Sequence, residues 1–195
     1  TIIMIPLMLT KPASGSSFWA QGGIAAVLDD ADCFAFHEAD TVKAGADLCD
    51  IETVRLMVRE APDVVRELSK WGVDFDKENN QLHLTMEGGH SHRRVAHVAD
   101  ATGREITQKL SEKVLDHHNI EIFHDRMAID LINLNKVNGY PSACAGAHVL
   151  NTTTDRVEVF QAKAVVIATG GASKVYLYTS NPDGSTGDGI AMAYR

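Results

Sequence analysis

The densest group of titratable side chains lies in the run Glu87-Gly-Gly-His-Ser-His-Arg-Arg94. Arginine binds carboxylates through two hydrogen bonds at once, and imidazole can donate to an oxyanion. Glu87 in this company would be a fixed negative charge for a substrate ammonium group. The run therefore predicts a cationic pocket wall for a small molecule with carboxylate groups, lined by His90, His92, Arg93 and Arg94. A solvated basic loop is the alternative interpretation.

Three histidines, His90, His92 and His97, also suggest a metal site. A His-x-His pair can chelate a metal from a strand, but no carboxylate or cysteine nearby completes a convincing set of ligands. The chain's three cysteines are scattered, and no two of them have metal-ligand spacing. We therefore predict no metal. A nonenzymatic, histidine-based metal-binding module remains the rival of a different class.

Two stretches have the composition of a cofactor contact. Thr169-Gly-Gly171 follows the apolar run Ala164–Ala168. Glycine lets the backbone approach a ligand, and ligands of open α/β sheets lie beyond the carboxyl ends of the strands. Ser16–Gly23 combines hydroxyls, one amide and paired glycines, which can line a flat polar ligand. A tight turn and an ordinary flexible loop are the alternatives.

A third stretch, Asn181–Gly189, comes directly before a predicted helix. Glycines at a helix N-terminus make a site for an anion or for ribityl hydroxyls. Asp188 is equally explained as a plain helix cap. The chain contains neither the G-x-G-x-x-G dinucleotide fingerprint nor a P-loop.

Composition narrows the class of protein. The chain has 195 residues, a formal charge of −8 and 45% hydrophobic residues, as expected of a globular protein with a sizeable core. The acidic balance argues against nucleic-acid binding and against a membrane-surface role. An odd number of cysteines is a poor disulfide framework, so we expect a reducing, cytoplasmic compartment.

Three helices are predicted to position these stretches. Asp32 is expected to cap a helix that runs to about Ala46. Asp50 is the better cap of a second helix, which ends near Gly72 and is split or kinked at Pro62. In the third helix, over residues 102–117, apolar side chains fall on one face.

The strand pattern predicts an α/β fold. Apolar runs indicate buried strands over Ile2–Leu9 and Ala164–Ala168, with a shorter strand at Ile120–Phe123. Two short strands flank Lys77–Asn80, and residues 85–100 are expected to be a loop. Short turns link three further strands into an inserted antiparallel meander, near Met127–Leu134, Ala143–Asn151 and Arg156–Gln161.

Several of these motifs together resemble the L-aspartate oxidases, within the succinate dehydrogenase and fumarate reductase flavoprotein superfamily. The resemblance runs from about Lys11 to Arg195. It rests on Ser-Ser-Phe-Trp-Ala-Gln-Gly-Gly, Glu-Gly-Gly-His-Ser-His-Arg-Arg, Asp-Ala-Thr-Gly-Arg-Glu, Ala-Thr-Gly-Gly-Ala-Ser-Lys and Asn-Pro-Asp-Gly-Ser-Thr-Gly-Asp-Gly. The second of these motifs is the one most specific to the aspartate oxidases.

The resemblance implies a Rossmann-like FAD-binding domain with noncovalent FAD. Glu87 would orient aspartate by its amino group. The residues expected to contact the cofactor are Lys11, Ser16, Ser17, Phe18, Trp19, Ala20, Gln21, Gly22, Gly23, Ala128, Thr169, Gly170 and Asp188.

The same resemblance implies that residues 1–195 are part of such a domain. The family's first strand and glycine fingerprint would precede Thr1. The capping domain, the C-terminal helical domain and the main catalytic arginine would follow Arg195. We therefore expect the parent protein to be the enzyme, with this chain alone inactive and a weak binder of FAD.

The implied reaction oxidises L-aspartate to iminoaspartate, the first step of NAD biosynthesis. Oxygen or fumarate would reoxidise the flavin, and quinolinate synthase would consume the product. A fumarate reductase or succinate dehydrogenase flavoprotein subunit is the nearest rival. Its substrate has no amino group, so it would leave an acidic residue at position 87 without a purpose.

Overall fold

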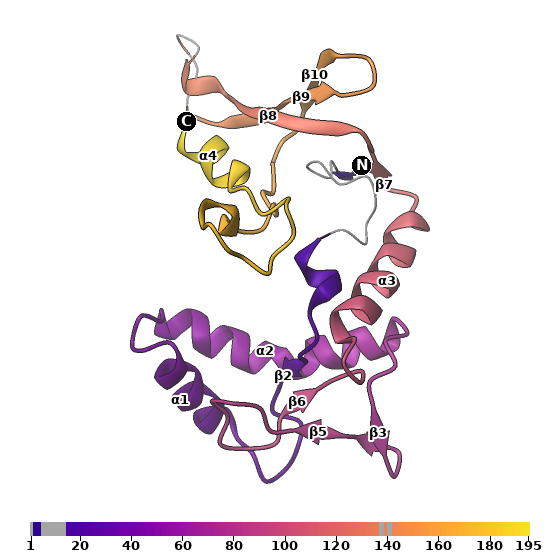
Figure 1. Ribbon diagram of the computed structural model, residues 1–195, viewed down its shortest axis with the longest axis vertical. Coiled ribbons are helices and arrows are strands. Elements are labelled where there is room, and N and C mark those ends of the chain that lie inside the picture. Colours follow the sequence, from indigo (N-terminus) through magenta and orange to yellow (C-terminus); the bar gives the residue numbers. More distant parts are fainter. Residues whose placement is uncertain (1, 5–14, 137–138, 140–141) are drawn as a thin grey trace. The chain divides into compact units, whose positions relative to one another are not determined.

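The computed structural model describes residues 2–4, 15–136, 139 and 142–195. The chain forms two compact units. One unit combines Thr1–Ser16 with Val114–Arg195, and the other is Ser17–Lys113. Figure 1 labels the elements of both units.

Two helices form one side of the Ser17–Lys113 unit, α1 (Phe34–Ala44) and α2 (Ile51–Lys70). Asp50 caps α2 as predicted, because its side chain accepts a hydrogen bond of 2.8 Å from the Thr53 backbone amide. Gly72 follows the end of α2 with a φ of +100°, a conformation that favours glycine. The predicted split at Pro62 is wrong, since α2 runs through this buried residue.

The predicted cap of α1 is also wrong. Cys33 occupies the N-cap position, and no side chain caps the helix there. The Asp32 carboxylate instead pairs with Arg94. A buried guanidinium offers this carboxylate stronger, charge-assisted hydrogen bonds than an exposed backbone amide would.

A small antiparallel sheet faces α2, with the strand order β2 (Ile24–Ala25), β6 (Val95–Ala96) and β5 (Leu84–Thr85). Residues 85–100, expected to be a loop, therefore contain one complete strand. The predicted pair of short strands is present as the hairpin of β3 (Lys77–Glu78) and β4 (Gln81–Leu82). The predicted turn at Lys77–Asn80 is too long, because Lys77 and Glu78 form the first strand. The two turn residues of the hairpin, Asn79 and Asn80, both have positive φ, as hairpin turns of this length favour.

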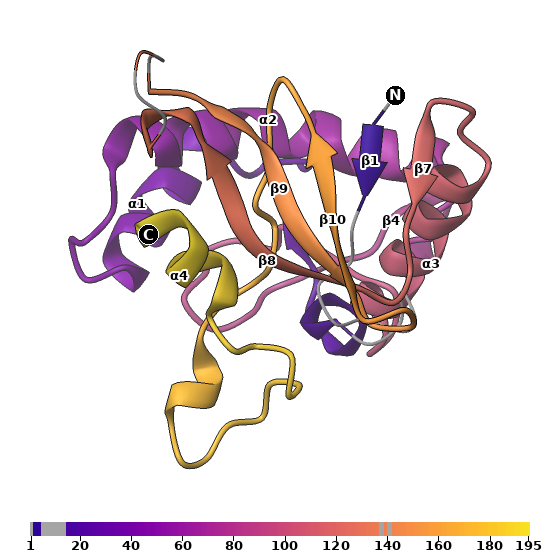
Figure 2. The same ribbon diagram turned by 90° about the horizontal axis from the view of Figure 1, so that it is seen from above.

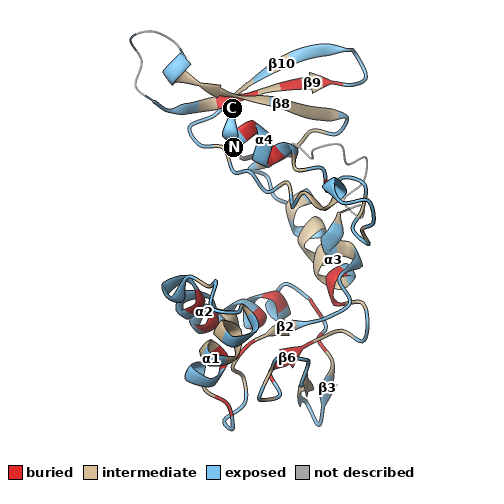
Figure 3. Ribbon diagram, turned by 60° about the vertical axis from the view of Figure 1, so that its left-hand side comes forward, coloured by how far each residue is buried: buried red, intermediate tan, exposed pale blue. Residues whose placement is uncertain are grey.

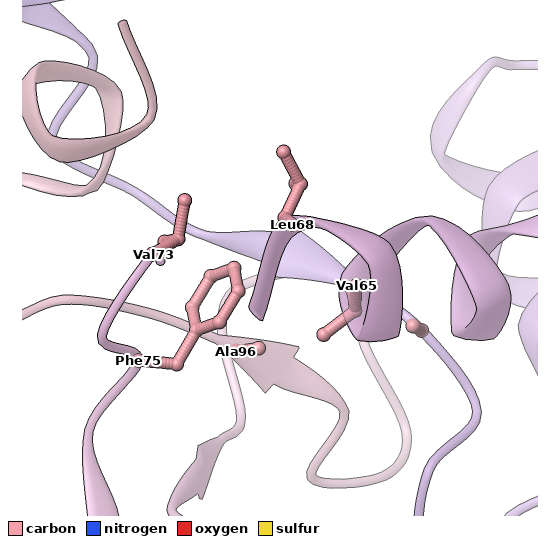
Figure 4. Close-up of a cluster of buried hydrophobic side chains, with 6 residues drawn as sticks. Val65, Leu68, Val73, Phe75 and Ala96 are labelled. Atoms are coloured by element: carbon pink, nitrogen blue, oxygen red, sulfur yellow. The ribbon is translucent and has the colours of Figure 1, made fainter. Parts of the chain in front are cut away.

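The core of this unit lies between α2 and the sheet. Figure 4 shows the side chains that meet there, from the last turns of α2, the segment that follows it and β6. They belong to Ala26, Val65, Leu68, Val73, Phe75 and Ala96. In Figure 3 the buried residues of α2 recur along the helix, as expected of a helix with one face against a core.

The third predicted helix is present as α3 (Thr102–Leu115), which ends two residues before the expected His117. Gly103 lies so close to the 3₁₀ helix η2 (Ser16–Trp19) that a Cβ there would clash with the Ser17 carbonyl oxygen. The Gly103 backbone amide also donates a hydrogen bond of 2.9 Å to the Ala20 carbonyl. Gly103 thus anchors the Ser17–Ala20 segment to the helix.

The other unit contains the predicted meander. Strands β8 (Arg126–Asn133), β9 (Cys144–Asn151) and β10 (Arg156–Gln161) form an antiparallel sheet in the order β10-β9-β8, seen in Figure 2. Strand β1 (Ile2–Met4) pairs in parallel with β7 (Ile120–Ile122). The rest of the predicted first strand, residues 5–9, lies outside the described residues.

The predicted strand at Ala164–Ala168 is wrong. These residues have no regular secondary structure, and Val166 is 88% exposed. An apolar run of this length forms a strand only where another strand pairs with it, and no strand among the described residues pairs with this run. Two short helices follow, η4 (Ser173–Val175) and α4 (Asp188–Tyr194).

None of the helices in the described part of the chain is long and apolar enough to cross a membrane.

Candidate functional site

The polar loop 87–94 connects β5 to β6. Its turn is closed by a hydrogen bond of 3.2 Å from the His90 amide to the Glu87 carbonyl. Gly89 has a φ of +88° within this turn, which a side chain would strain. The Glu87 side chain is exposed, so its carboxylate is open to a ligand.

Arg94 ends the loop as a buried ion pair with two aspartates from the start of the unit. It donates two hydrogen bonds of 2.8 Å to the two carboxylate oxygens of Asp32. A third, of 2.7 Å, reaches Oδ2 of Asp40 on α1. The side chains of Arg94 and Asp32 are 0% and 1% exposed. Three of its five N–H donors bind the two aspartates and the side chain is fully buried, so Arg94 stabilises the loop and is not free for a substrate.

The prediction of Arg94 as a ligand for substrate carboxylates is therefore wrong. Arg93, its neighbour, is exposed and forms no ion pair within the described residues, so its guanidinium is available. The two adjacent residues are both arginines, so residue type alone does not show which of them is buried. The difference arises because neighbouring residues of an extended segment point to opposite sides.

Asp40 fastens the middle of the loop to α1. Its Oδ2 accepts hydrogen bonds from the Ser91 amide at 2.8 Å and from the Ser91 hydroxyl at 2.7 Å. Burial alone would raise the pKa of Asp40. The hydrogen bonds from Ser91 and Arg94 outweigh burial and lower the pKa to about 2. Asp40 is thus a carboxylate at neutral pH.

The lowered pKa of Asp40 predicts a loss of stability in acid. Its ordinary pKa is 3.8, so the stabilisation is complete above that value and disappears as pH falls towards about 2. We expect a loss of about 2 kcal/mol across this window. The measurement is the free energy of unfolding in urea against pH for wild type and Asp40→Asn. The difference between them should shrink as pH falls; a difference independent of pH would contradict the assignment.

His92 lies against α1. Its ring stacks on Phe36 at 4.7 Å between centroids, with 7° between planes. Its Nδ1 lies 2.9 Å from the Ser91 hydroxyl and 3.8 Å from Oδ1 of Asp32. The imidazole is therefore fixed in both plane and direction.

The other two histidines of the predicted group have different surroundings. His90 lies beside His37 of α1, with 6.0 Å between ring centroids, and Nδ1 of each is buried without a partner among the described residues. Burial, followed by the charge of Arg94, lowers the pKa of His37 and favours its neutral form. His97 pairs with Asp76 at 3.1 Å.

Within residues 2–4, 15–136, 139 and 142–195, no group of three or more potential ligands is arranged to hold a metal ion.

In the glycine-rich stretch Ser17–Gly23, all residues except Phe18 are exposed. Arg104 lies over the Phe18 ring, with its guanidinium carbon 5.9 Å from the ring centroid. A Cβ at Gly22 would meet open space, whereas one at Gly23 would clash with the Ala96 carbonyl of β6. Gly22 is thus open to a ligand, and Gly23 serves the packing of the sheet.

In the other unit the remaining glycine-rich stretches lie side by side. The Gly187 amide donates a hydrogen bond of 3.1 Å to the Gly171 carbonyl. Ser16 joins them, since its hydroxyl lies 3.5 Å from the buried Ser185 hydroxyl. A Cβ at Gly189 would clash with the Thr169 hydroxyl, so Thr169 lies against the first turn of α4.

The backbone at Gly170 and Gly171, in the centre of these glycine-rich stretches, has free space beside it. Gly170 has a φ of +74°, and an added Cβ at Gly170 or Gly171 would have no heavy atom within 4 Å. Asp188 is exposed and accepts a hydrogen bond of 2.6 Å from the Thr186 hydroxyl. No side chain caps α4, so the alternative of Asp188 as a plain helix cap is wrong.

Ala128 lies in β8 opposite Val149, directly before an irregularity in the pairing with β9. The carbonyl of the next residue, Ile129, accepts a hydrogen bond of 2.8 Å from Arg195. Backbone groups leave the regular ladder at such a position and become available to other partners. Lys11, also expected at the cofactor, lies outside the described residues.

Sequence reasoning missed the residues that support loop 87–94, namely Asp32, Asp40 and Ser91. One signal was present: His37 and Asp40 are three residues apart and so share one face of a helix. Two polar side chains on the inner face of a helix predict a buried polar contact. The sequence contains no signal that Arg94 is the partner.

Comparison with known proteins identifies the family to which the chain belongs. The sequence pattern of the FAD binding domain family matches residues 7–195, and the chain belongs to this family. The prediction of FAD as the cofactor is confirmed at this level.

The chain is 49% identical to the L-aspartate oxidase of Vibrio cholerae, over 94% of this chain and 35% of that protein. It is 50% identical to the L-aspartate oxidase of Pseudomonas aeruginosa, over 94% of this chain and 36% of that protein. The chain thus spans about a third of the length of these relatives. The resemblance stated from the motifs is confirmed.

The fold is similar to that of a mutant E. coli quinol fumarate reductase, with a TM-score of 0.89 at 30% identity. That comparison covers 98% of this chain and 32% of the other. It confirms the mixed helix and sheet fold of the FAD-binding domain in this superfamily.

Proposed function

We propose that the whole protein oxidises L-aspartate to iminoaspartate with noncovalent FAD. The observation that carries the proposal is the 49% and 50% identity to L-aspartate oxidases over nearly the whole chain. The fumarate reductase alternative is favoured only by fold similarity, at 30% identity. The exposed carboxylate of Glu87 also suits a substrate with an amino group.

The residues present fit FAD. The open backbone at Gly170 and Gly171 can approach a pyrophosphate or a flavin without steric conflict. We assign the cofactor to this group and to the irregular backbone near Ala128 in the same unit, and the resemblance adds Gly22 and the exposed segment around it. The side chains that would hold it, together with Lys11, are Ser16, Ser17, Phe18, Trp19, Gln21, Thr169 and Asp188. FAD, when bound, supplies the acceptor for two electrons.

Substitution of Gly171 by alanine tests this assignment. The added methyl group meets open space and no strained φ, so the free energy of unfolding should stay within about 0.5 kcal/mol of wild type. If FAD occupies that space, its Kd should rise roughly tenfold. The measurement is flavin titration of the whole protein. The control is Thr154→Ala, an exposed position in the turn between β9 and β10 that is assigned to neither FAD nor the substrate. Equal affinities of the two variants for FAD would show that FAD does not occupy the space beside Gly171.

The substrate is assigned to loop 87–94. Glu87 would bind the ammonium group, and the exposed guanidinium of Arg93 would bind a carboxylate through two hydrogen bonds. His90 and His92 would complete the wall. The buried Asp32–Arg94–Asp40 network stabilises the loop, so these groups need little reordering when the substrate binds.

The β8–β10 sheet would be an insertion in a Rossmann-like FAD-binding domain, of which this chain is part. Oxygen or fumarate would reoxidise the flavin in the cytoplasm, and quinolinate synthase would use the iminoaspartate.

The test is the kcat/KM of the whole protein for oxidation of L-aspartate and of succinate. We expect turnover with L-aspartate and little with succinate, because the two substrates differ in one ammonium group. Preference for succinate would favour the fumarate reductase and succinate dehydrogenase alternative.

A further inference from the structure

The position of His92 leaves one of its ring nitrogens available. Phe36 holds the ring plane, and Nδ1 faces both the Ser91 hydroxyl and the Asp32 carboxylate. The side chain is 30% exposed. Its Nε2 has no hydrogen-bond partner in the described part of the chain, and it is not among the enclosed polar atoms there.

The hydrogen bonds around Ser91 determine which nitrogen carries the proton. The Ser91 hydroxyl has one proton, which it donates to Oδ2 of Asp40 at 2.7 Å. Asp40 is a carboxylate at neutral pH and can only accept. The Ser91 oxygen must then accept from Nδ1 of His92, and the nearby Asp32 carboxylate favours the same arrangement. Neutral His92 therefore has its proton on Nδ1 and a lone pair on Nε2.

A lone pair on Nε2 selects the group that it can bind. L-aspartate at neutral pH has two carboxylates, which only accept hydrogen bonds, and one ammonium, which only donates. Neutral His92 therefore matches the ammonium group, and not the oxyanions that the sequence had suggested for it.

Resting on the proposed function, we propose that His92 is the general base that takes a proton from the substrate ammonium group. One N–H bond of the ammonium breaks, its electron pair stays on the substrate nitrogen, and the proton bonds to Nε2. The products of this step are a neutral amine and an imidazolium. Oxidation to the imine requires this step, because the nitrogen lone pair forms the new C=N bond.

The charges around His92 suit the imidazolium that results. Asp32 and Asp40 contribute two negative charges, and Arg94 between them contributes one positive charge. A proton on His92 therefore neutralises the group. His37, on the same helix as Asp40, does not compete for this proton, since burial and Arg94 favour its neutral form.

The first test reads the tautomer without any turnover. The whole protein, labelled with ¹⁵N in histidine only, is examined by NMR at neutral pH, and the His92 signals are identified by their loss in His92→Gln. We expect a protonated Nδ1 and an unprotonated Nε2. Ser91→Ala should shift the proton towards Nε2, because Nδ1 loses its acceptor. A wild-type His92 with its proton on Nε2 would overturn the proposal.

The second test separates a base from a structural residue. His92→Gln keeps a polar side chain but cannot take a proton. It should lower kcat for L-aspartate oxidation about a hundredfold or more. It should also abolish the acidic limb of the pH profile, which is the decrease of kcat/KM at low pH where the proposed base would already carry a proton. Fumarate reduction, which involves no ammonium group, should fall much less than L-aspartate oxidation. His118→Gln, at an exposed position, is the control.

The outcomes distinguish the base role from the proposed function. If wild type oxidises L-aspartate but His92→Gln keeps the acidic limb, or loses both reactions equally, His92 is not the base. If the wild type loses activity as the pH rises, and His92→Gln binds fumarate more weakly, then His92 is a cationic ligand for carboxylates and not a base. A wild type that does not oxidise L-aspartate overturns the proposed function and the base role together, while the NMR spectrum still decides the tautomer.

Discussion

Replacement of Arg94 by methionine is expected to lower the free energy of unfolding by about 3–5 kcal/mol. Methionine fills a similar volume, so a cavity is not the cause. The substitution leaves the carboxylates of Asp32 and Asp40 without their cation, and Asp32 is only 1% exposed. Removal of one partner from a buried ion pair is costly because the remaining charge is desolvated and uncompensated. The measurement is urea unfolding of the chain followed by circular dichroism.

Two further variants identify the cause of this loss. Arg93→Met changes the exposed neighbour and should alter the free energy of unfolding by less than about 0.5 kcal/mol. Combining Arg94→Met with Asp32→Asn and Asp40→Asn leaves no uncompensated charge, and it should recover part of the loss. If Arg94→Met and Arg93→Met cost the same small amount, the ion pair does not stabilise the unit.

Replacement of Glu87 by glutamine is expected to lower kcat/KM for L-aspartate oxidation about ten- to a hundredfold, or about 1.5–3 kcal/mol. Glutamine keeps the shape of the side chain and removes the charge that would pair with the substrate ammonium. Fumarate has no amino group, so its reduction should be nearly unchanged. The assay is the kcat/KM of both reactions in the whole protein, wild type and variant.

The structure predicts that this substitution leaves folding unaffected. The Glu87 side chain is exposed, and within the described residues no side chain binds it. Unfolding in urea should therefore be the same for wild type and Glu87→Gln. Equal losses in the two reactions would mean that Glu87 supports the loop or the flavin and does not recognise the ammonium group.

The elements predicted correctly are those with local signals. Asp50 and Gly72 mark the two ends of α2, and both lie within a residue or two of the helix. The three meander strands were found because each is long and separated by a turn. The apolar run Ala164–Ala168 has an equally clear pattern, yet it forms no strand in the described chain, because a strand also needs a partner that the pattern does not contain.

The site was predictable by residue type but not by contact. The run 87–94 was identified from its histidines, arginines and glutamate alone. Its support depends on Arg94 meeting partners 62 and 54 residues earlier in the chain, and only the fold brings these together. For the same reason Asp32 was mistaken for a helix cap: the pattern of a cap is local, whereas the buried guanidinium that binds it is not.

Anaerobic reduction of the flavin tests most directly whether the whole protein takes electrons from L-aspartate. The whole protein with bound FAD is mixed with L-aspartate without oxygen, and the flavin absorbance is followed in time. We expect L-aspartate to bleach the flavin and succinate at the same concentration to leave it largely oxidised. Bleaching by succinate and not by L-aspartate, or by neither, would contradict the account.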